Sequence, residues 1–183
     1  MSSFDSSQYG PIVASLLNDG SLAPLDAGQP NEKFHAALAA LSPEKLFADT
    51  GQSIRDLRMA NATLAGLWLR HNFLDESHTL SQEIETPTGS FWHAILHRRE
   101  GDYGNSRYWF RRVGSHPIFP ALNEAAMTAG WPVGPRWNPV ALVDAVEQAN
   151  LRKNPQPSME VLVAVQQIEW ELLFDYSWKQ MLG

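Results

Sequence analysis

A short pattern recurs along this chain: a polar residue, then a proline, then apolar residues spaced three and four apart. It occurs at Ser42-Pro43, His116-Pro117 and Asn138-Pro139, and Ser158 follows Pro157 before the last apolar run. Proline fits the first turn of a helix, where its missing N–H has no intrahelical partner to lose, and a polar side chain there caps free backbone N–H groups. The pattern therefore predicts a helix start at each of these places.

Apolar spacing supports the same interpretation. The last segment is expected to be a helix from Ser158 to about Met181, with one apolar face formed by Val161, Leu162, Val165, Ile168, Leu172 and Tyr176. A second helix is expected to start at Ser53, with a core stripe formed by Ile54, Leu57, Ala65, Trp68 and Leu69. No segment alternates apolar and polar residues for long enough to predict a strand. We therefore predict an all-α fold.

The 183 residues suit one domain, because a chain of this length buries about 70% of the surface that it exposes when unfolded. No linker or low-complexity run divides the chain, so we predict a single compact α-helical domain over residues 1–183, with residues 1–30 loosely attached. Glycine and proline predict irregular structure over residues 19–30 and 129–137, and the two tryptophans of the second segment indicate a loop folded back onto the body.

A weak internal repeat appears when Ser77 is aligned with Ser106. It relates the helix that ends at Asn72, with the segment after it, to the helix that opens at Ser90, with the segment after it. The repeat predicts paired antiparallel helices over residues 65–120. Successive hairpins of similar length are the unit of TPR-like solenoids, and an irregular helical bundle is the alternative that the pattern leaves open.

Composition excludes several classes of function. The chain has no cysteine, which excludes disulfides, thiolate metal ligands and a cysteine nucleophile. Its net charge is −6 and its isoelectric point is about 5.4, which disfavours nucleic acid and anionic membranes as partners. The first residues lack a secretory signal pattern, and no window is apolar enough for a membrane span, so we expect a cytoplasmic protein. Glycine-rich phosphate loops and the G-x-S-x-G motif are absent from the sequence.

Side chains that bind metals, anions and flat rings concentrate between Trp68 and His116. His93 and His97 stand four residues apart in an expected helix, so both imidazoles leave the same face. This is the spacing at which a helix presents two nitrogen ligands to one metal ion.

Other residues could complete a metal site with this pair. Asp75 and His78, three residues apart, have the carboxylate–histidine spacing that helical bundles use in dinuclear iron and manganese centres. The candidate ligands are His71, His78, His93 and His97, the candidate general bases are Glu76 and Glu100, and the candidate metals are Zn, Fe and Mn. Ala94 follows the first histidine of the pair, where a familiar zinc hydrolase has glutamate. Histidines hydrogen-bonded within the packed interior are the alternative interpretation.

Arginines in the same region predict an anion site. Arg107 and Arg111 are four residues apart on one helical face, and guanidinium groups donate paired, in-plane hydrogen bonds to carboxylate or phosphate. The candidate ligand-binding residues are His93, His97, Arg98, Arg107, Arg111, Trp92 and Trp109. Ion pairs that only orient helices are the alternative.

The blocks ETPTGSFWHAILHRREGD and NSRYWFRRVG resemble the hallmark of a small family of uncharacterised helical proteins, in which blocks of the type ETPxGSFWHxIxHRREGD and NxxYWFRRVG follow one another. The resemblance covers residues 65–120. It implies that the two blocks belong to one unit, and it assigns no activity and no catalytic residue.

Two functions of different classes follow. The favoured one is a binding or interaction module, monomeric or homodimeric, with a His/Arg/Trp-lined pocket for a small anionic ligand, an acidic peptide end or a protein partner. The alternative is a metal-dependent enzyme for hydrolysis or oxygen chemistry that uses His93 and His97 with His78 or His71. Spatial convergence separates them, since a mononuclear centre requires the ring nitrogens of His78, His93 and His97 to lie within about 4–5 Å of one another.

Overall fold

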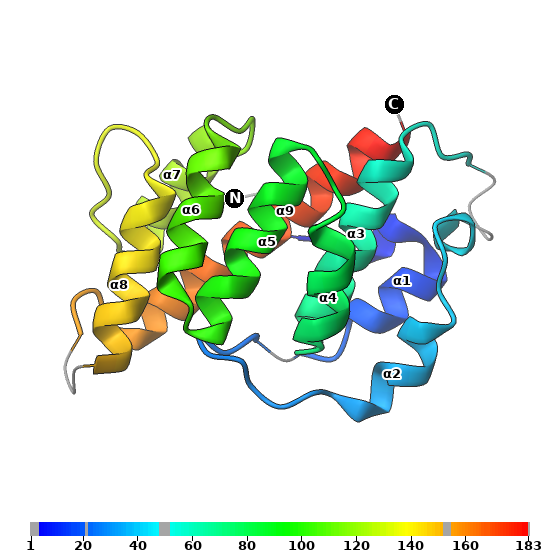
Figure 1. Cartoon of the computed structure of the whole chain (residues 1–183), viewed down its shortest axis with the longest axis horizontal. Helices are drawn as coiled ribbons and strands as arrows, with labels where there is room; N and C mark the ends of the chain where they lie inside the picture. Colours follow the sequence, from blue (N-terminus) through cyan, green and yellow to red (C-terminus); the bar gives the residue numbers. More distant parts are fainter. Residues whose placement is uncertain (1–3, 21, 48–51, 152–154, 183) are drawn as a thin grey trace.

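The computed structural model describes residues 4–20, 22–47, 52–151 and 155–182, and within this part of the chain it contains helices and no strand (Figure 1). The all-α prediction is confirmed. In chain order the elements are η1 Ser6–Tyr9, α1 Gly10–Leu17, α2 Glu32–Ala39, η2 Glu44–Phe47, α3 Leu57–Arg70, α4 Leu74–Ser81, α5 Pro87–Glu100, α6 Tyr103–Val113, α7 Phe119–Thr128, α8 Pro139–Leu151 and α9 Met159–Leu182. No helix among these residues is both long enough and apolar enough to cross a membrane.

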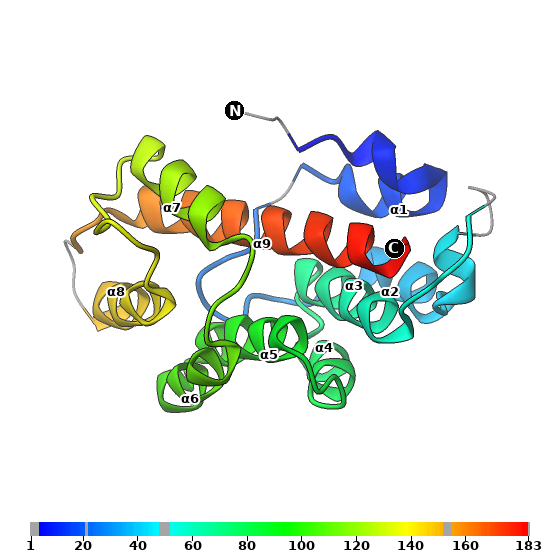
Figure 2. The same ribbon diagram turned by 90° about the horizontal axis from the view of Figure 1, so that it is seen from above.

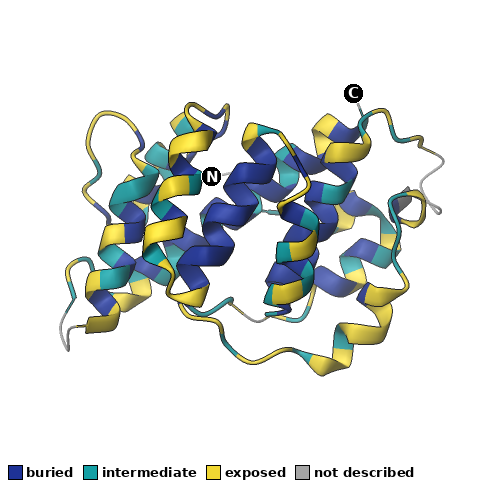
Figure 3. Cartoon of the chain, viewed as in Figure 1, coloured by how far each residue is buried: buried dark blue, intermediate teal, exposed yellow. Residues whose placement is uncertain are grey.

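The long helix α9 runs through the middle of the molecule, with α1 and α7 on one side and α3 to α6 on the other (Figure 2). The second central element is α5, in which every residue from Thr88 to Arg99 is buried (Figure 3). These two helices bring charged and polar side chains into the core together with apolar ones. The buried polar side chains must therefore find partners inside the protein.

Two of the four predicted helix starts carry the expected side-chain cap, whereas α7 begins at Phe119 without a side-chain cap and Ser42-Pro43 precedes only the short 3-10 helix η2. Helix α8 begins directly after Asn138, whose side-chain oxygen accepts the N–H of Val140, and α9 begins after Ser158, whose hydroxyl accepts the N–H of Val161. Ser53, however, is the wrong start for α3. That helix begins at Leu57, because the carboxylate of Asp56 accepts the N–H groups of Arg58 and Met59.

Two of the predicted apolar stripes need correction. In α3, Leu57 is 55% exposed and does not belong to the core. In α9, Leu162 and Val165 are buried as expected, but Ile168, Leu172 and Tyr176 are only half-buried. The buried residues of α9 also include Gln166, Glu169, Trp170, Leu173, Phe174, Ser177, Trp178 and Met181. Because neighbours cover α9 on more than one side, a single apolar stripe does not describe its burial.

The two predicted helical hairpins are present as α3 with α4 and α5 with α6, and they lie side by side (Figure 1). Helix α5 begins at Pro87 rather than Ser90, since the Thr86 hydroxyl accepts the N–H of Gly89. At Gly66 an added Cβ would lie 2.8 Å from the ring of Trp92. This glycine therefore lets α3 and α5 approach closely around a buried indole.

The described part of residues 1–30 is packed onto the body. Tyr9, Val13 and Leu16 are buried in the core. The irregular segment after α1 is held by buried polar groups: Gln166 donates to the carbonyls of Ala23 and Pro24, and Arg99 donates to those of Asp26 and Ala27. The expected irregular loop after α7 carries Trp131 and Trp137, which are buried against each other with ring centroids 5.6 Å apart.

Candidate metal site

Three histidines from two helices meet at one point. His78 lies on α4, and His93 and His97 lie on α5. One ring nitrogen from each residue can be chosen so that all three nitrogens lie within 4.8 Å of one another. The ring centroid of His78 is 4.6 Å from that of His93 and 5.4 Å from that of His97, and the His93 and His97 centroids are 4.6 Å apart. This is the convergence that a mononuclear centre requires.

Local sequence explains how the three rings meet. The spacing of four residues stacks His93 and His97 on one face of α5. The connection from α4 passes close over the start of α5 at Gly89, where a Cβ would lie only 2.2 Å from the carbonyl oxygen of Ile84. No other residue fits there without displacing the connection, so Gly89 lets α4 pack against α5 with His78 beside the pair.

The ring of His93 is buried, and one of its nitrogens has no hydrogen-bond partner among the described residues. Its side of α5 faces α6, where the Trp109 ring stacks on it with centroids 4.1 Å apart and planes 16° apart. Its Nδ1 is buried and has no hydrogen-bond partner among the described residues. Burial, followed by repulsion from His97 and His78, lowers the pKa of His93 to about 3. The ring is therefore neutral at physiological pH, which is the form that binds metal ions.

His97 is oriented by a carboxylate. Its Nδ1 lies 2.9 Å from Oε2 of Glu100, one turn later on the same helix. This contact places the proton of a neutral His97 on Nδ1 and leaves Nε2 as an acceptor for a metal ion. Glu100 is exposed and His78 is half-buried, so the cluster opens toward solvent on this side.

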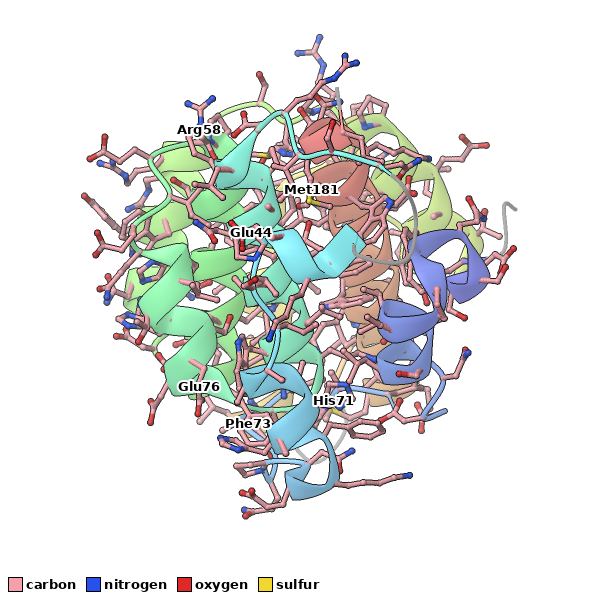
Figure 4. All side chains as sticks on the ribbon, turned by 90° about the vertical axis from the view of Figure 1, so that its right-hand side faces the viewer. Glu44, Arg58, His71, Phe73, Glu76 and Met181 are labelled. Carbon is pink, nitrogen blue, oxygen red and sulfur yellow. The ribbon has the colours of Figure 1, made fainter. Side chains whose placement is uncertain are left out.

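Two residues from the predicted metal set lie elsewhere. Nε2 of His71 is 2.9 Å from the carbonyl oxygen of Leu16, and its ring packs against Phe34. Glu76 lies 3.9 Å from Nε2 of His35 on α2 and outside the histidine cluster. Figure 4 shows His71 and Glu76 at the end of the molecule where α2 packs. His71 is therefore removed from the ligand set, and Glu76 from the candidate bases, because α2 and the end of α1 occupy the space around them.

Most residues of the predicted anion pocket are engaged by other parts of the chain. Arg98 is buried and donates to Glu169 of α9 over 2.5 Å. Arg107 donates to Asp144 over 2.9 Å and also pairs with Glu147, both on α8.

Trp92 also points away from the histidine cluster, and its Nε1 donates to Ser177 over 3.2 Å. The predicted pocket is therefore not assembled, because carboxylates of α8 and α9 take up the arginines. Of its members, only Trp109 lies against the His93 and His97 pair, and Arg111 lines a separate cleft.

Sequence analysis assigned no role to Gly89 or Arg99. Glycine inside an apolar helical pattern is a signal of close approach, and Gly89 carried that signal. Arg99 is buried at 2% exposure and donates to three backbone carbonyls in two separate segments. No local pattern distinguishes it from the exposed arginines of the same block, because its partners lie far away in the sequence.

Comparison with known proteins finds no matching family model, no matching curated protein and no matching solved structure. The resemblance of residues 65–120 to an uncharacterised helical family stays a prediction.

Proposed function

We propose that the protein binds one divalent transition metal ion, zinc in the first place, through His78, His93 and His97, and that the site supports hydrolytic chemistry. The observation that carries the proposal is the approach of one ring nitrogen from each residue to within 4.8 Å of the others. Nitrogen ligands of a tetrahedral zinc ion lie about 3.3 Å apart when each bond is about 2.0–2.1 Å. Metal binding therefore requires the three imidazoles to rotate toward one another.

The surroundings of the three rings support a metal ion over plain packing. A buried polar atom without a partner costs about 1–3 kcal/mol, and Nδ1 of His93 is such an atom. Burial and repulsion from His97 and His78 keep the His93 ring neutral, which is the form that binds a metal ion. Glu100 supplies the outer carboxylate that metal-binding histidines commonly have, which fixes the ring and raises its basicity.

The donor set favours zinc among the candidate metals. All three donors are imidazole nitrogens, which suit Zn, whereas Mn prefers carboxylate oxygens and non-haem Fe enzymes commonly combine two histidines with a carboxylate. Asp75 is exposed and does not belong to the cluster. Three histidines with a fourth position open are the arrangement of catalytic zinc sites, in which the metal lowers the pKa of its water ligand to about 7.

The role of Glu100 differs from that expected of a general base. Its carboxylate is engaged with Nδ1 of His97, so we assign it the positioning of that ring. The solvent-facing side between His78 and Glu100 is the route by which water and substrate reach the open position.

Metal analysis of the full chain, purified without an affinity tag, tests the binding proposal. We expect about one zinc ion per chain by mass spectrometry, and tetrahedral visible absorption bands after replacement by Co²⁺. His78→Ala removes the half-buried ligand with the least disturbance of the core and should lose most of the metal. His35→Ala, which removes an exposed histidine outside the cluster, is the matched control and should retain it.

The buried pair requires a second measurement, because His93→Ala with His97→Ala also opens a cavity. Zinc should raise the melting temperature of the parent protein by mass action and leave that of the double variant unchanged. A parent protein that holds no zinc and gains no stability from it would overturn the binding proposal. If zinc binds stoichiometrically but hydrolysis of p-nitrophenyl acetate is the same for zinc-loaded and chelated protein, the hydrolytic part is wrong.

A further inference from the structure

A cleft separate from the histidine cluster lies between the end of α6, the start of α7 and the loop that precedes α8 (Figure 1). It is a cleft of about 820 Å³. Small-molecule sites in proteins commonly measure about 300–1,000 Å³. None of the three metal-site histidines lines it.

Two cations line this cleft without a counter-ion. The guanidinium groups of Arg111 and Arg136 form no hydrogen bond and no ion pair with any described residue, and no described Asp or Glu lines the cleft. This is unusual for a chain with a net charge of −6. Arg107, one turn before Arg111 on α6, has two carboxylate partners on α8. The carboxylates of α8 therefore pair with Arg107, whereas no described carboxylate lies in the lining of the cleft beside Arg111.

The floor of the cleft is aromatic and contains polar atoms without partners. Phe110, Phe119 and Trp137 line it. Trp137 is only 7% exposed, and its Nε1 is buried with no acceptor among the described residues. Asn123 also lines the cleft, and its Oδ1 has no donor although its amide nitrogen donates to the Gly134 carbonyl.

The remaining titratable side chain of the lining does not compete for an anion. Both ring nitrogens of His116 are engaged, one with Thr88 at 3.2 Å and the other as acceptor of the Ile118 N–H at 3.4 Å. Burial lowers the pKa of His116 to about 4, so the ring stays neutral. Positive charge in the cleft therefore comes from the two arginines alone.

We propose that this cleft binds a small aromatic carboxylate, with the anionic head between Arg111 and Arg136 and the flat body against Phe110, Phe119 and Trp137. Guanidinium groups pair with carboxylates through in-plane hydrogen bonds and also stack on flat rings, so the two arginines suit both ends of such a molecule. A neutral aromatic molecule leaves both cations unpaired, and an inorganic anion leaves the aromatic floor unused.

Titration of the full chain with 4-fluorobenzoate, followed by ¹⁹F NMR, tests the site. We expect saturable binding by the parent protein. The affinity should fall about tenfold or more in each of the single variants Arg111→Gln and Arg136→Gln, since a charge-assisted hydrogen bond contributes about that factor. Arg112→Gln is the matched control, because Arg112 is the next residue on α6, lies over the Trp109 ring and does not line the cleft. Its affinity should equal that of the parent.

Three further arms identify the chemistry. Neutral 4-fluorobenzamide should bind at least tenfold more weakly than the carboxylate, and 4-fluorophenyl phosphate tests whether a phosphate head is preferred. Chelation of metal ions with EDTA should leave binding unchanged, which separates this cleft from a carboxylate bound at the proposed metal site. The proposal is overturned if 4-fluorobenzoate fails to saturate, if the two arginine variants bind it like Arg112→Gln, or if the phosphate binds far more tightly.

Discussion

The last two turns of α5 carry two kinds of side chain on two faces, and the faces differ in which groups lie against them. One face presents His93 and His97 to α4, and the other presents Arg98 and Arg99 to the core. The four residues lie within one short stretch of sequence. Their surroundings give them different roles.

Arg99 finds its partners within the chain. Its guanidinium donates to the carbonyls of Asp26, Ala27 and Leu69 and to the side chain of Asn72. Burial, followed by repulsion from Arg98, lowers its pKa to about 10, so it remains charged at neutral pH. These contacts tie the irregular segment after α1 to the end of α3 and assign Arg99 a structural role.

The histidine face lacks such partners. Glu100 engages one ring nitrogen of His97, but Nδ1 of His93 has no partner among the described residues. The comparison teaches that the kind of side chain does not distinguish a structural residue from a site residue. Unpartnered atoms alone do not distinguish them either, since Nε and Nη1 of the buried Arg98 also lack hydrogen-bond partners among the described residues. What distinguishes the histidines is that three rings from two helices converge, whereas the guanidinium of Arg98 meets the carboxylate of Glu169.

Loss of the Arg98 partner should have the largest effect on stability. Glu169→Leu leaves a buried arginine without its carboxylate, and we expect the free energy of unfolding to fall by about 3–5 kcal/mol. Urea unfolding measures it. Lys179→Leu breaks an exposed pair with Asp175 on the same helix and is expected to cost less than about 1 kcal/mol. Equal effects of the two variants would contradict the structural role of the buried pair.

Arg99→Met should cost about 2–3 kcal/mol, since it leaves buried carbonyl groups without donors. Hydrogen exchange should become faster in residues 22–31 in particular, which the guanidinium holds against the body. Arg112→Met, a change at an exposed position on the neighbouring helix α6, should stay within about 0.5 kcal/mol of the parent. Unchanged exchange in residues 22–31 would show that Arg99 does not hold this segment.

On the histidine face, Glu100→Ala should weaken zinc binding about 10–100-fold, which corresponds to about 1.4–2.7 kcal/mol, with little change in metal-free stability. Competition with a chromophoric chelator measures the affinity. Glu83→Ala removes another exposed carboxylate near the end of α4 and is the control. If the two variants bind zinc equally, Glu100 does not position His97.

The smallest expected effect concerns His116, a buried histidine whose two ring nitrogens both have hydrogen-bond partners, unlike those of His93. The pKa of His116 is lowered by burial from 6.5 to about 4. Between these values the unfolded chain binds a proton that the folded chain does not, so its stability contribution is complete above pH 6.5 and declines as the pH falls toward 4. From about pH 6 to pH 5 this amounts to about 1 kcal/mol.

His116→Gln removes this titration. The rings around His116 are Phe91 on α5, Phe119 on α7 and Tyr176 on α9, and Thr88 completes the contacts. Chemical denaturation at the two pH values should therefore show a shallower pH dependence for the variant than for the parent. Parallel pH profiles would mean that the fold does not hold His116 neutral.

The sequence predicts the features of this protein that depend on neighbouring residues. The helix starts at Asn138 and Ser158 follow from local capping, and the pairing of His93 with His97 follows from the helical repeat. The start of α3 was missed by a few residues because Asp56, rather than Ser53, accepts its first N–H groups. Serine and aspartate are both good N-cap residues, so residue type alone does not decide which of the two caps α3.

The tertiary structure alone decided which residues met across helices. The crossing of α4 over α5 at Gly89 brings His78 next to His93 and His97. His71 lies apart from this pair, against the end of α1. The sequence by itself determined an all-α chain with His93 and His97 on one face, because the backbone repeat fixes distances along a helix. It did not determine the partners of the arginines or the third histidine, since those depend on how separate helices pack and on which polar groups each packing leaves unpaired.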